Sequence, residues 1–350
     1  MALDGLRGLA ILIVLLSHSG NLGLVFADFL DFQKTGKIGV YLFFVLSAYL
    51  LDRQIAIAYV TKKAGSLYWK NYFLRRFLRI YPLYTISLFT FLGITLLGFP
   101  TVIQNPHEVI QHLLLRKGES IFWSVPVEFK YYILSPFIIF FCHRFLKWKM
   151  QQLLWFFLIL TVFSIAIELN YELALISTLR YLPIFLAGTF VAVSELLLNH
   201  SKKQLPGIIT HNSAGIIALS IILITTPYYF KLIFGVDVNF HHAIFFMPYA
   251  ILWSVLLVSV KHGHGFISRM FKFKPLRFLG TISYSLYLFH MPVLQFLQAD
   301  LGIPQGLKIY IFFALSILFS SFSYLLIELP LSKIKLIQKP IREADIEKNK

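Results

Sequence analysis

The sequence predicts an all-α integral membrane protein, a bundle of about ten transmembrane helices with both termini in the cytoplasm. Only 14% of its 350 residues are charged and the mean hydropathy is +0.74, whereas about a quarter of the residues of soluble domains are charged. Long apolar runs recur along the chain, and the segments between them alternate in their content of Lys and Arg. We therefore expect a multi-pass protein of the cell (plasma or inner) membrane.

Ten apolar runs have about the 20-residue length that a helix needs to cross a bilayer. In order along the chain, they are 6–26, 36–52, 80–99, 121–142, 152–168, 175–197, 212–230, 242–260, 280–298 and 307–328. The first resembles a signal peptide in length, but no small-residue cleavage site follows it, so we expect it to remain as a span. The second and fifth runs are short, which leaves the number of spans open by about one.

The charges between these runs predict the orientation of the bundle. One set of segments is rich in Lys and Arg, with seven in 52–79, three in 143–150, two in 199–211, five in 261–279 and six from 331 onward. The segments between them contain few Lys and Arg, with two in 27–38, two in 99–120, none in 169–174, one in 231–241 and one in 299–308. The positive-inside rule places the basic set in the cytoplasm. No segment is long enough for another folded domain, so we expect a membrane domain over 1–330 and a charged cytoplasmic tail over 331–350.

The net charge of +16 does not indicate a nucleic-acid partner. The basic residues lie between apolar runs rather than on one soluble face, so we expect them to contact anionic lipids. The single cysteine, Cys142, rules out a disulfide framework, and the histidines show no spacing typical of a zinc or iron site.

The first span contains ionisable residues that lipid does not favour. Arg7 and His18 are eleven residues apart, close to three helical turns, so they share one face and lie about 16 Å apart along the axis. An ionisable group at the centre of a span costs about 2.5–3.5 kcal/mol and is a functional-site hypothesis by default. The alternatives are that Arg7 is a snorkelling topology anchor and that His18 is a core histidine bonded to nearby backbone.

A second polar centre is WSVPVEFKYY, residues 123–132. Glu128 lies about two turns into a span directed oppositely to the first, so we expect it at a depth similar to that of His18. A carboxylate beside an imidazole fixes its tautomer and raises its basicity, as a general base requires. The alternative is a structural ion pair of Glu128 with Lys130 or Arg180.

The third feature is LRRFLRIYP, residues 74–82, at the cytoplasmic start of the third span. Arg76 and Arg79 are three residues apart and share a helix face, with Arg75 beside them. Guanidinium groups bind phosphates well. The alternative is a plain positive-inside cluster.

Two further residues are candidates for contact with substrate. Arg180 begins the sixth span on the outer side, where an acceptor or an anionic lipid would reach it. His290 in SYSLYLFHMP lies at a depth comparable to that of His18, although a lone helix histidine before Pro292 also suits a structural hydrogen bond.

Six segments of the chain resemble the acyltransferase-3 family of integral membrane acyltransferases. They are LDGLRGLAILIVLLSH (3–18), GVYLFFVLSAYLL (39–51), RRFLRIYP (75–82), WSVPVE (123–128), RYLPIFLAG (180–188) and LGTISYSLYLFHMP (279–292). Six such strings in order within ten spans make the resemblance highly specific. Two positions depart from the family pattern. Ala48 stands where Gly is usual, and Phe129 and Lys130 follow Glu128 where an acidic residue or Trp and then Gln are commoner.

The resemblance implies transfer of an acyl group, usually acetyl, from cytoplasmic acyl-CoA to hydroxyls of carbohydrates outside the membrane. It implies that His18 is the catalytic histidine, that Arg7 is the arginine of the first helix, and that Arg76 and Arg79 lie near the phosphates of CoA. Glu128 falls on the acidic position of the fourth span. Many members also contain an extracytoplasmic SGNH-type esterase domain, which this sequence lacks, so we expect any second transfer step to need a partner.

These expectations combine into one mechanism. Acetyl-CoA is the donor substrate, no cofactor is permanently bound, and the CoA phosphates are held by Arg7, Arg75, Arg76 and Arg79. His18, supported by Glu128, deprotonates the acceptor hydroxyl or itself accepts the acyl group. Arg180 or His290 stabilises the oxyanion or contacts the glycan.

The competing hypothesis is a transporter or flippase for an anionic glycolipid or polysaccharide precursor, which would need no acyl-CoA. The acceptor stays open among O-antigen, capsule, exopolysaccharide, peptidoglycan and small glycosides. A homodimer is compatible with the sequence, which leaves the oligomeric state open.

Overall fold

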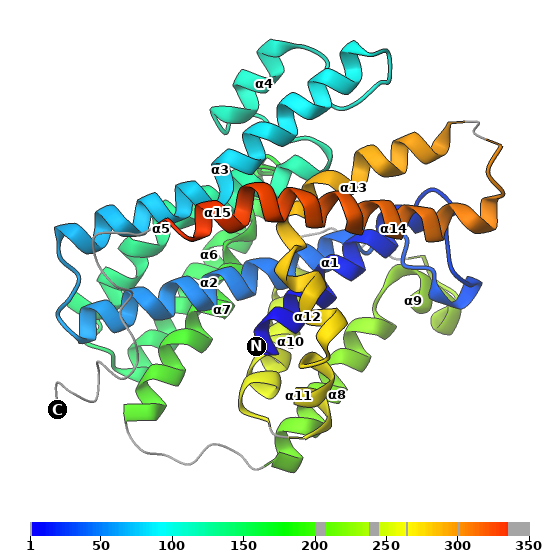
Figure 1. The fold of residues 1–350 in the computed structure, drawn as a ribbon. Coiled ribbons are helices and arrows are strands. Elements are labelled where there is room, and N and C mark those ends of the chain that lie inside the picture. The colour runs from blue at the N-terminus through cyan, green and yellow to red at the C-terminus, as the bar shows by residue number, and fades with distance from the viewer. Residues whose placement is uncertain (1, 201–207, 238–244, 264, 300–301, 335–350) are drawn as a thin grey trace.

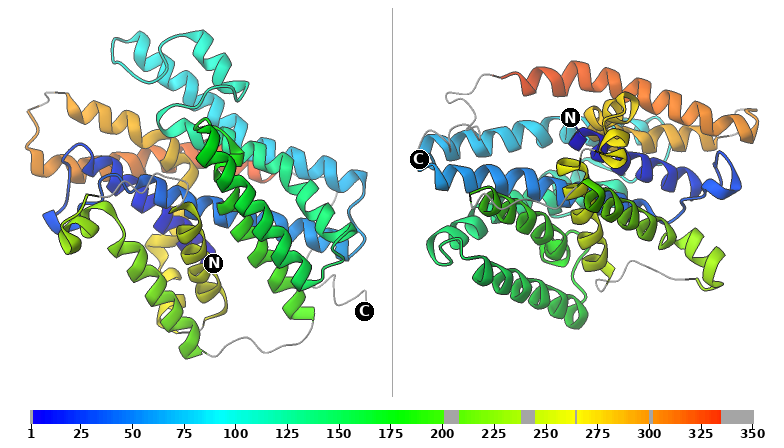
Figure 2. Two further views of the ribbon diagram at one scale, coloured as in Figure 1. Left: turned by 180° about the vertical axis from the view of Figure 1, so that it is seen from behind. Right: turned by 90° about the horizontal axis from the view of Figure 1, so that it is seen from below.

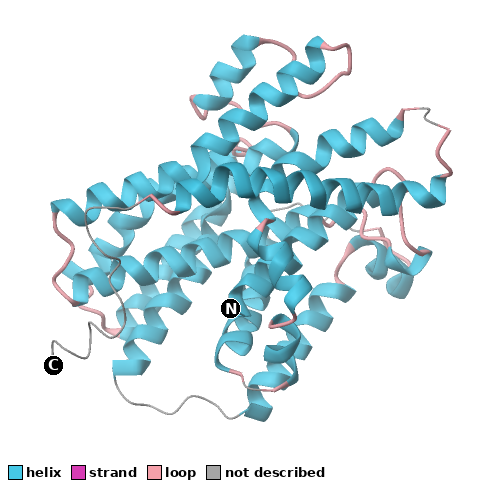
Figure 3. Ribbon diagram, viewed as in Figure 1, coloured by secondary structure: helices cyan, strands magenta, loops and turns pink. Residues whose placement is uncertain are grey.

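The computed structural model describes residues 2–200, 208–237, 245–263, 265–299 and 302–334, and over these ranges it contains helices and loops but no strand (Figure 3). The predicted all-α fold is confirmed. The predicted tail lies almost entirely outside the described residues, as does the start of the predicted span 242–260.

Each predicted span overlaps a helix of the structure (Figure 1). These helices are α1 (Ala2–Gly20), α2 (Gly36–Val60), α3 (Ser66–Leu96), α5 (Ser124–Arg144), α6 (Met150–Tyr171), α7 (Thr178–His200), α8 (Ile208–Ile224), α10 (Phe246–His262), α13 (Ser283–Gln298) and α14 (Gln305–Ser323). Shorter elements connect or extend them, namely η1 (Asp28–Leu30), α4 (Pro106–Leu113), η2 (Ser120–Trp123), α9 (Pro227–Phe234), α11 (Phe266–Phe271), α12 (Lys274–Thr281), the π-helical turn η4 (Tyr324–Glu328) and α15 (Leu329–Ser332).

Seven helices within the described ranges are long and apolar enough to cross a membrane, and α8 with α9 makes an eighth if the pair counts as one span. The predicted span 212–230 is not straight, because α8 and α9 meet at an angle of 81°. Pro227 begins α9, and a proline has no backbone N–H with which to continue the preceding helix. The helices α10 and α13 are shorter, with 17 and 16 residues. The chain is thus a multi-pass membrane protein.

Two helices extend well beyond the predicted spans. Helix α2 continues to Val60, and α3 begins at Ser66, so only 61–65 separates them. The segment between the predicted spans is rich in Ala, Leu and Arg, which favour helix, whereas hydropathy marks only the part that lipid surrounds. The motif RRFLRIYP therefore lies inside α3 and not at the start of a helix.

Some of the helix connections lie at two opposite ends of the bundle, as the right-hand view of Figure 2 shows. The connections 61–65 and 145–149 lie at one end, which we call the basic end, and 21–35 and α9 lie at the opposite end. For these segments, the arrangement agrees with the predicted alternation between segments rich and poor in Lys and Arg.

Helix α2 is the most buried of the seven spans and packs against α1, α5, α7 and α10. At the centre of this packing, Ala48 faces Gly188 of α7, and a Cβ on Gly188 would overlap the backbone of Val45. The alanine that replaces the usual glycine is therefore accommodated by a glycine on the partner helix. In contrast, α6 and α14 expose large apolar side chains such as Trp155 and Phe322, which suit contact with lipid tails.

Three glycines allow α1 to approach the α11–α12 segment closely. A Cβ on Gly5 would overlap the backbone carbonyl of Phe271, a Cβ on Gly8 would overlap that of Leu276, and a Cβ on Gly280 would overlap that of Asp4. Small residues at helix contacts in membranes let backbones pack by van der Waals contact. This contact fixes the helix on which Arg7 and His18 lie.

Replacing Gly8 with valine should destabilise the fold by about 1–3 kcal/mol or more, because the new side chain meets backbone that cannot rotate away. The midpoint of thermal unfolding in detergent measures the effect. The matched control is Gly93→Val in α3, where a Cβ meets nothing within 4 Å. Equal unfolding midpoints for the two variants would contradict the close α1–α12 contact.

The segment between α3 and α5 folds on itself through hydrogen bonds around the start of α4. Asn105 caps α4 by accepting a hydrogen bond from the backbone N–H of Glu108 at 3.0 Å. The side chain of Glu108 accepts hydrogen bonds from the backbone N–H of Gln104 at 2.7 Å and from Lys117 Nζ at 2.9 Å. These bonds, the backbone one first, hold the pKa of Glu108 below its usual value.

Candidate functional site

A small polar cavity of about 60 Å³ lies inside the bundle, where α1, α2, α3, α5 and α13 meet. Arg7 of α1, Arg79 of α3 and Glu128 of α5 all line it. Hydroxyl and aromatic side chains complete its wall, among them Ser47, Tyr132, Tyr284 and Tyr287. The structure thus brings together three predicted site residues from three distant motifs. We call this space the polar cavity.

Glu128 is held in the polar cavity by hydroxyl groups. Its Oε1 accepts a hydrogen bond from Ser47 Oγ and another, at 2.5 Å, from the Tyr132 hydroxyl one turn further along α5. Glu128 forms no hydrogen bond with His18, whose Nδ1 lies next to Met291 and His290 instead. Neither of the alternative ion pairs considered for Glu128 is formed either. The prediction that Glu128 directly supports His18 is therefore wrong.

The depth of Glu128 in the bundle explains this correction. His18 lies beside Gly36 at the start of α2, whereas Glu128 is bonded to Ser47, eleven residues further along that helix. Eleven helical residues rise about 16 Å, so Glu128 lies nearer the level of Arg7. Hydropathy places the outer end of the fourth span at 121, but Ser124, the first residue of α5, is already buried inside the bundle.

The arginines at the polar cavity are well placed for an anion. Arg7 is half-buried and Arg79 is exposed, and within the described ranges neither forms an ion pair with a carboxylate. Arg76 lies over the ring of Tyr132, with its Cζ 5.5 Å from the ring centroid, and borders the cavity without lining it. Arg75 does not line it either. Two neighbouring guanidinium groups that line one cavity, neither of them in an ion pair with a described carboxylate, suit an anionic ligand such as a phosphate.

The second polar centre is a pair of histidines further along α1 and α13. His18 Nδ1 is 3.4 Å from His290 Nε2 and 3.0 Å from Met291 Sδ. The two rings meet edge to face, with centroids 5.0 Å apart and an interplanar angle of 68°. His290 is fully buried, and its Nδ1 is 2.9 Å from the backbone carbonyl of Leu286. The structure therefore pairs two predicted site residues that lie 272 positions apart.

One face of α13 connects the polar cavity with the histidine pair. Tyr284 and Tyr287 line the cavity, and the Tyr287 ring lies 6.3 Å from that of His290, measured between centroids. The Tyr287 hydroxyl accepts a hydrogen bond from Ser124 Oγ at 2.8 Å and donates one to the carbonyl of Ile121 at 2.6 Å. The sequence reasoning missed these tyrosines, although their spacing of three residues from one another and from His290 places them on one helix face.

Arg180 has a different environment from the one predicted. Its Nε is 3.0 Å from Glu168 Oε1, and its NH1 donates a hydrogen bond to the carbonyl of Leu173 at 2.8 Å. It lines neither the polar cavity nor the histidine pair. The guanidinium group thus joins α7 to the end of α6.

A fully buried carboxylate that hydropathy places at a span boundary lies at the centre of the bundle. Asp52 of α2 accepts hydrogen bonds from the hydroxyls of Tyr131 and Ser135 on α5 and of Thr189 on α7. Three hydroxyl donors satisfy a buried carboxylate. We read Asp52 as the polar tie between α2, α5 and α7. The signal in the sequence was the i, i+4 pair of hydroxyl residues on α5.

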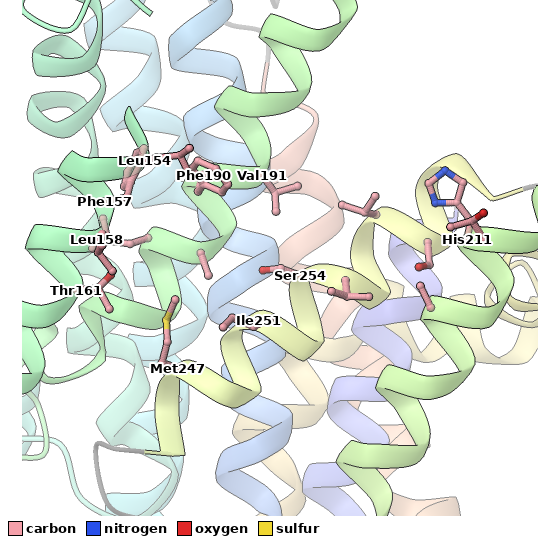
Figure 4. A pocket seen from close by; sticks show the side chains of 17 residues that line it. Leu154, Phe157, Leu158, Thr161, Phe190, Val191, His211, Met247, Ile251 and Ser254 are labelled. Carbon is pink, nitrogen blue, oxygen red and sulfur yellow. The ribbon is translucent and has the colours of Figure 1, made fainter. Parts of the chain in front are cut away.

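A larger cavity of about 540 Å³ opens between α6, α7, α8 and α10. Figure 4 shows its lining, which is mostly apolar, with side chains such as Phe157, Phe190 and Met247. His211 lies at its far side and none of the predicted site residues lines it. Its chemistry suits apolar chains, so the polar cavity and the histidine pair are the better candidates for catalysis.

Comparison with known proteins identifies a family that covers nearly the whole chain. The model of the acyltransferase-3 family, described as an acyltransferase domain, matches residues 2–328. This range contains the polar cavity and both histidines. No solved structure matches the chain.

Three curated relatives are similar over 95% of this chain. The sequence is 24% identical to the peptidoglycan O-acetyltransferase OatA of Listeria monocytogenes, covering 56% of that protein. It is 25% identical to a putative O-acetyltransferase of Staphylococcus aureus strain COL and to the O-acetyltransferase OatA of Staphylococcus aureus strain NCTC 8325, covering 57% of each. The chain thus spans just over half the length of the curated relatives it matches.

Proposed function

Because the chain belongs to the acyltransferase-3 family, we propose that it transfers an acetyl group from acetyl-CoA to a hydroxyl group of a cell-surface glycan. Relatives that are named O-acetyltransferases support acetyl as the acyl group. The Listeria relative is named for peptidoglycan, which makes peptidoglycan the first acceptor to test.

The polar cavity is the proposed donor site. Arg7 and Arg79 would bind phosphates of CoA, with Arg76 and Arg75 at the rim, because guanidinium groups bind phosphate by paired hydrogen bonds. A space of about 60 Å³ is far smaller than CoA. The nucleotide would therefore stay at the exposed side of Arg79, and only the acyl-bearing arm would enter as the cavity widens. Glu128, together with Ser47 and Tyr132, belongs to this donor site in our proposal.

The pantetheine arm would then extend along α1 and α13 towards His18. Arg7 and His18 are separated by about 16 Å along the helix, a distance that an extended pantetheine arm can cover. Tyr284 and Tyr287 would line its course. The single observation that supports this proposal most strongly is that Arg7 and Arg79 line one cavity, neither in an ion pair within the described part of the chain, and that Arg7 lies on the face of α1 that leads to His18.

The chemistry that His18 would perform is general-base catalysis. Nε2 of His18 takes the proton of the acceptor hydroxyl while the hydroxyl oxygen attacks the thioester carbonyl. The tetrahedral intermediate breaks its C–S bond, and the imidazolium returns the proton to the leaving thiolate. The products are the O-acetyl ester and CoA. If His18 carried the acetyl group, the same bonds would be exchanged in two half-reactions.

The test is acetyl transfer by the purified protein reconstituted in liposomes. The protein is incubated with acetyl-labelled acetyl-CoA and soluble peptidoglycan fragments, and base-labile label on the glycan is measured. We expect label on the glycan with wild type and none without protein. Absence of label on every glycan offered, together with no binding of acetyl-CoA, would refute the proposal and favour transport of an anionic glycolipid.

Gly36 gives a separate prediction about the space beside His18. A Cβ at this position would lie 3.3 Å from both Nε2 and Cδ2 of His18, so Gly36→Ala should crowd the reacting nitrogen and lower kcat several-fold. Stability should stay equal or rise slightly, because alanine restricts the unfolded chain. The matched control is Gly65→Ala before α3, where a Cβ meets nothing within 4 Å. Equal kcat for both variants would show that Nε2 does not face this space.

A further inference from the structure

His290 is placed to control which nitrogen of His18 carries the proton. We propose that His290 is a positioning residue that holds His18 in the Nδ1–H form, so that Nε2 of His18 is the free base that receives the acceptor's proton. The catalytic consequence rests on the proposed acetyl transfer. The tautomer itself is a property of the structure and can be measured on its own.

The argument starts at the backbone of α13. The carbonyl oxygen of Leu286 lies 2.9 Å from Nδ1 of His290, and a carbonyl oxygen can only accept a hydrogen bond. Nδ1 of His290 therefore carries hydrogen. In neutral imidazole the other nitrogen is then an acceptor, so Nε2 of His290 presents a lone pair to His18.

The second step concerns the two neighbours of His18 Nδ1. His290 Nε2 at 3.4 Å and Met291 Sδ at 3.0 Å both lie around this nitrogen. A thioether sulfur is only an acceptor, so both neighbours require Nδ1 of His18 to be the donor. Both contacts are satisfied by the same tautomer, and because a thioether is the weaker acceptor, His290 is the neighbour that holds it.

The third step identifies the nitrogen that is left. With hydrogen on Nδ1, neutral His18 has its lone pair on Nε2. Nε2 points to the start of α2, beside Gly36, and no group among the described residues forms a hydrogen bond to it. It is therefore open to an acceptor hydroxyl. His290 performs the orienting role that the sequence assigned to Glu128.

Burial makes His290 a firm support. The side chain is fully buried, and its carbonyl partner lies one turn back on the same helix, so ring and acceptor move together. Proteins commonly select the tautomer of a reactive histidine by a hydrogen bond to the ring nitrogen that does not react.

The tautomer is tested by ¹⁵N NMR of histidine-labelled protein in nanodiscs, with the signals of His18 identified by their loss in His18→Ala. We expect hydrogen on Nδ1 and none on Nε2 in wild type. Hydrogen on Nε2 of His18 in wild type would overturn the proposal, whether or not the protein transfers acetyl groups.

Kinetics test the role in catalysis, with three variants compared for kcat and for KM of acetyl-CoA. His290→Leu, which has no acceptor, should lower kcat by about 10²-fold, the lower range for general-base catalysis, with KM changed less than about twofold. His290→Gln, which keeps an acceptor near His18, should recover most of kcat. His112→Leu is the control, because His112 is equally buried but bonded to Tyr84 outside this site.

The outcomes separate the two proposals. Unchanged kcat in His290→Leu, or equal losses in the Leu and Gln variants, would refute the positioning role while acetyl transfer by wild type stands. Absence of transfer by wild type would refute the proposed function, and the NMR result would still decide the tautomer.

Discussion

Replacing His18 with alanine is expected to abolish acetyl transfer and to leave binding of acetyl-CoA unchanged. The imidazole is the proposed base, and a general base contributes about 10²–10⁴-fold to a rate. The proposed phosphate contacts lie about 16 Å away along α1. Initial rates of label transfer give the loss, and equilibrium dialysis with labelled CoA gives the affinity.

The control for this variant must remove a histidine without touching the site. His112→Ala serves, because His112 of α4 is fully buried and lies within hydrogen-bond distance of Tyr84 on α3, away from this site. If His18→Ala transferred label at the rate of His112→Ala, His18 would have no catalytic role. If His18→Ala lost CoA binding as well, the separation of donor site and base along α1 would be wrong.

Replacing Arg7 and Arg79 together with glutamine is expected to weaken CoA binding by about 10²-fold or more. A hydrogen bond to a charged group contributes about 1.5–3 kcal/mol, and each 1.4 kcal/mol is a factor of ten in affinity. Glutamine keeps the length and a hydrogen-bond donor while removing the charge. The dissociation constant is measured by dialysis at several salt concentrations, and its salt dependence should fall in the variant.

The matched control is Arg116→Gln, an exposed arginine in the segment before α5. Comparison of CoA with 3′-dephospho-CoA then shows which phosphate the pair contacts, because the variant should lose discrimination between the two if the 3′-phosphate is bound. A double variant that binds CoA as tightly as Arg116→Gln would show that the polar cavity does not hold the donor.

Most of the fold was predictable from hydropathy and charge, because lipid requires apolar spans of fixed length. Every predicted span overlaps a helix. The predicted boundaries were less accurate. Helix α2 ends at Val60 and α3 begins at Ser66, both outside the apolar runs, because helix-forming residues extend each helix past the part that lipid surrounds. The 81° bend at Pro227 was foreseeable from the proline, whereas the contact of α1 with the α11–α12 segment through its glycines depended on tertiary packing.

The sequence motifs identified most of the residues of the site, but not which of them contact one another. Arg7, Arg79 and Glu128 do meet, and His18 does meet His290. Helix geometry within one span gave the separation of Arg7 from His18, but depth estimates between spans depended on where each helix enters the membrane. An error of about 16 Å, or three helical turns, in the depth of Glu128 was enough to pair it with the wrong residue. The tautomer-selecting carbonyl of Leu286 is backbone and leaves no trace in the sequence.

The central claim is that an acetyl group enters at the basic end of the bundle and reaches a glycan at the opposite end through His18. It is tested most directly in sided proteoliposomes, with labelled acetyl-CoA on one face, a membrane-impermeant glycan on the other, and the protein's orientation determined by protease accessibility of the 61–65 connection. We predict label on the glycan only when acetyl-CoA faces the basic end, and none with His18→Ala. Label that appears only when donor and glycan share one face, or equally with His18→Ala, would contradict the account.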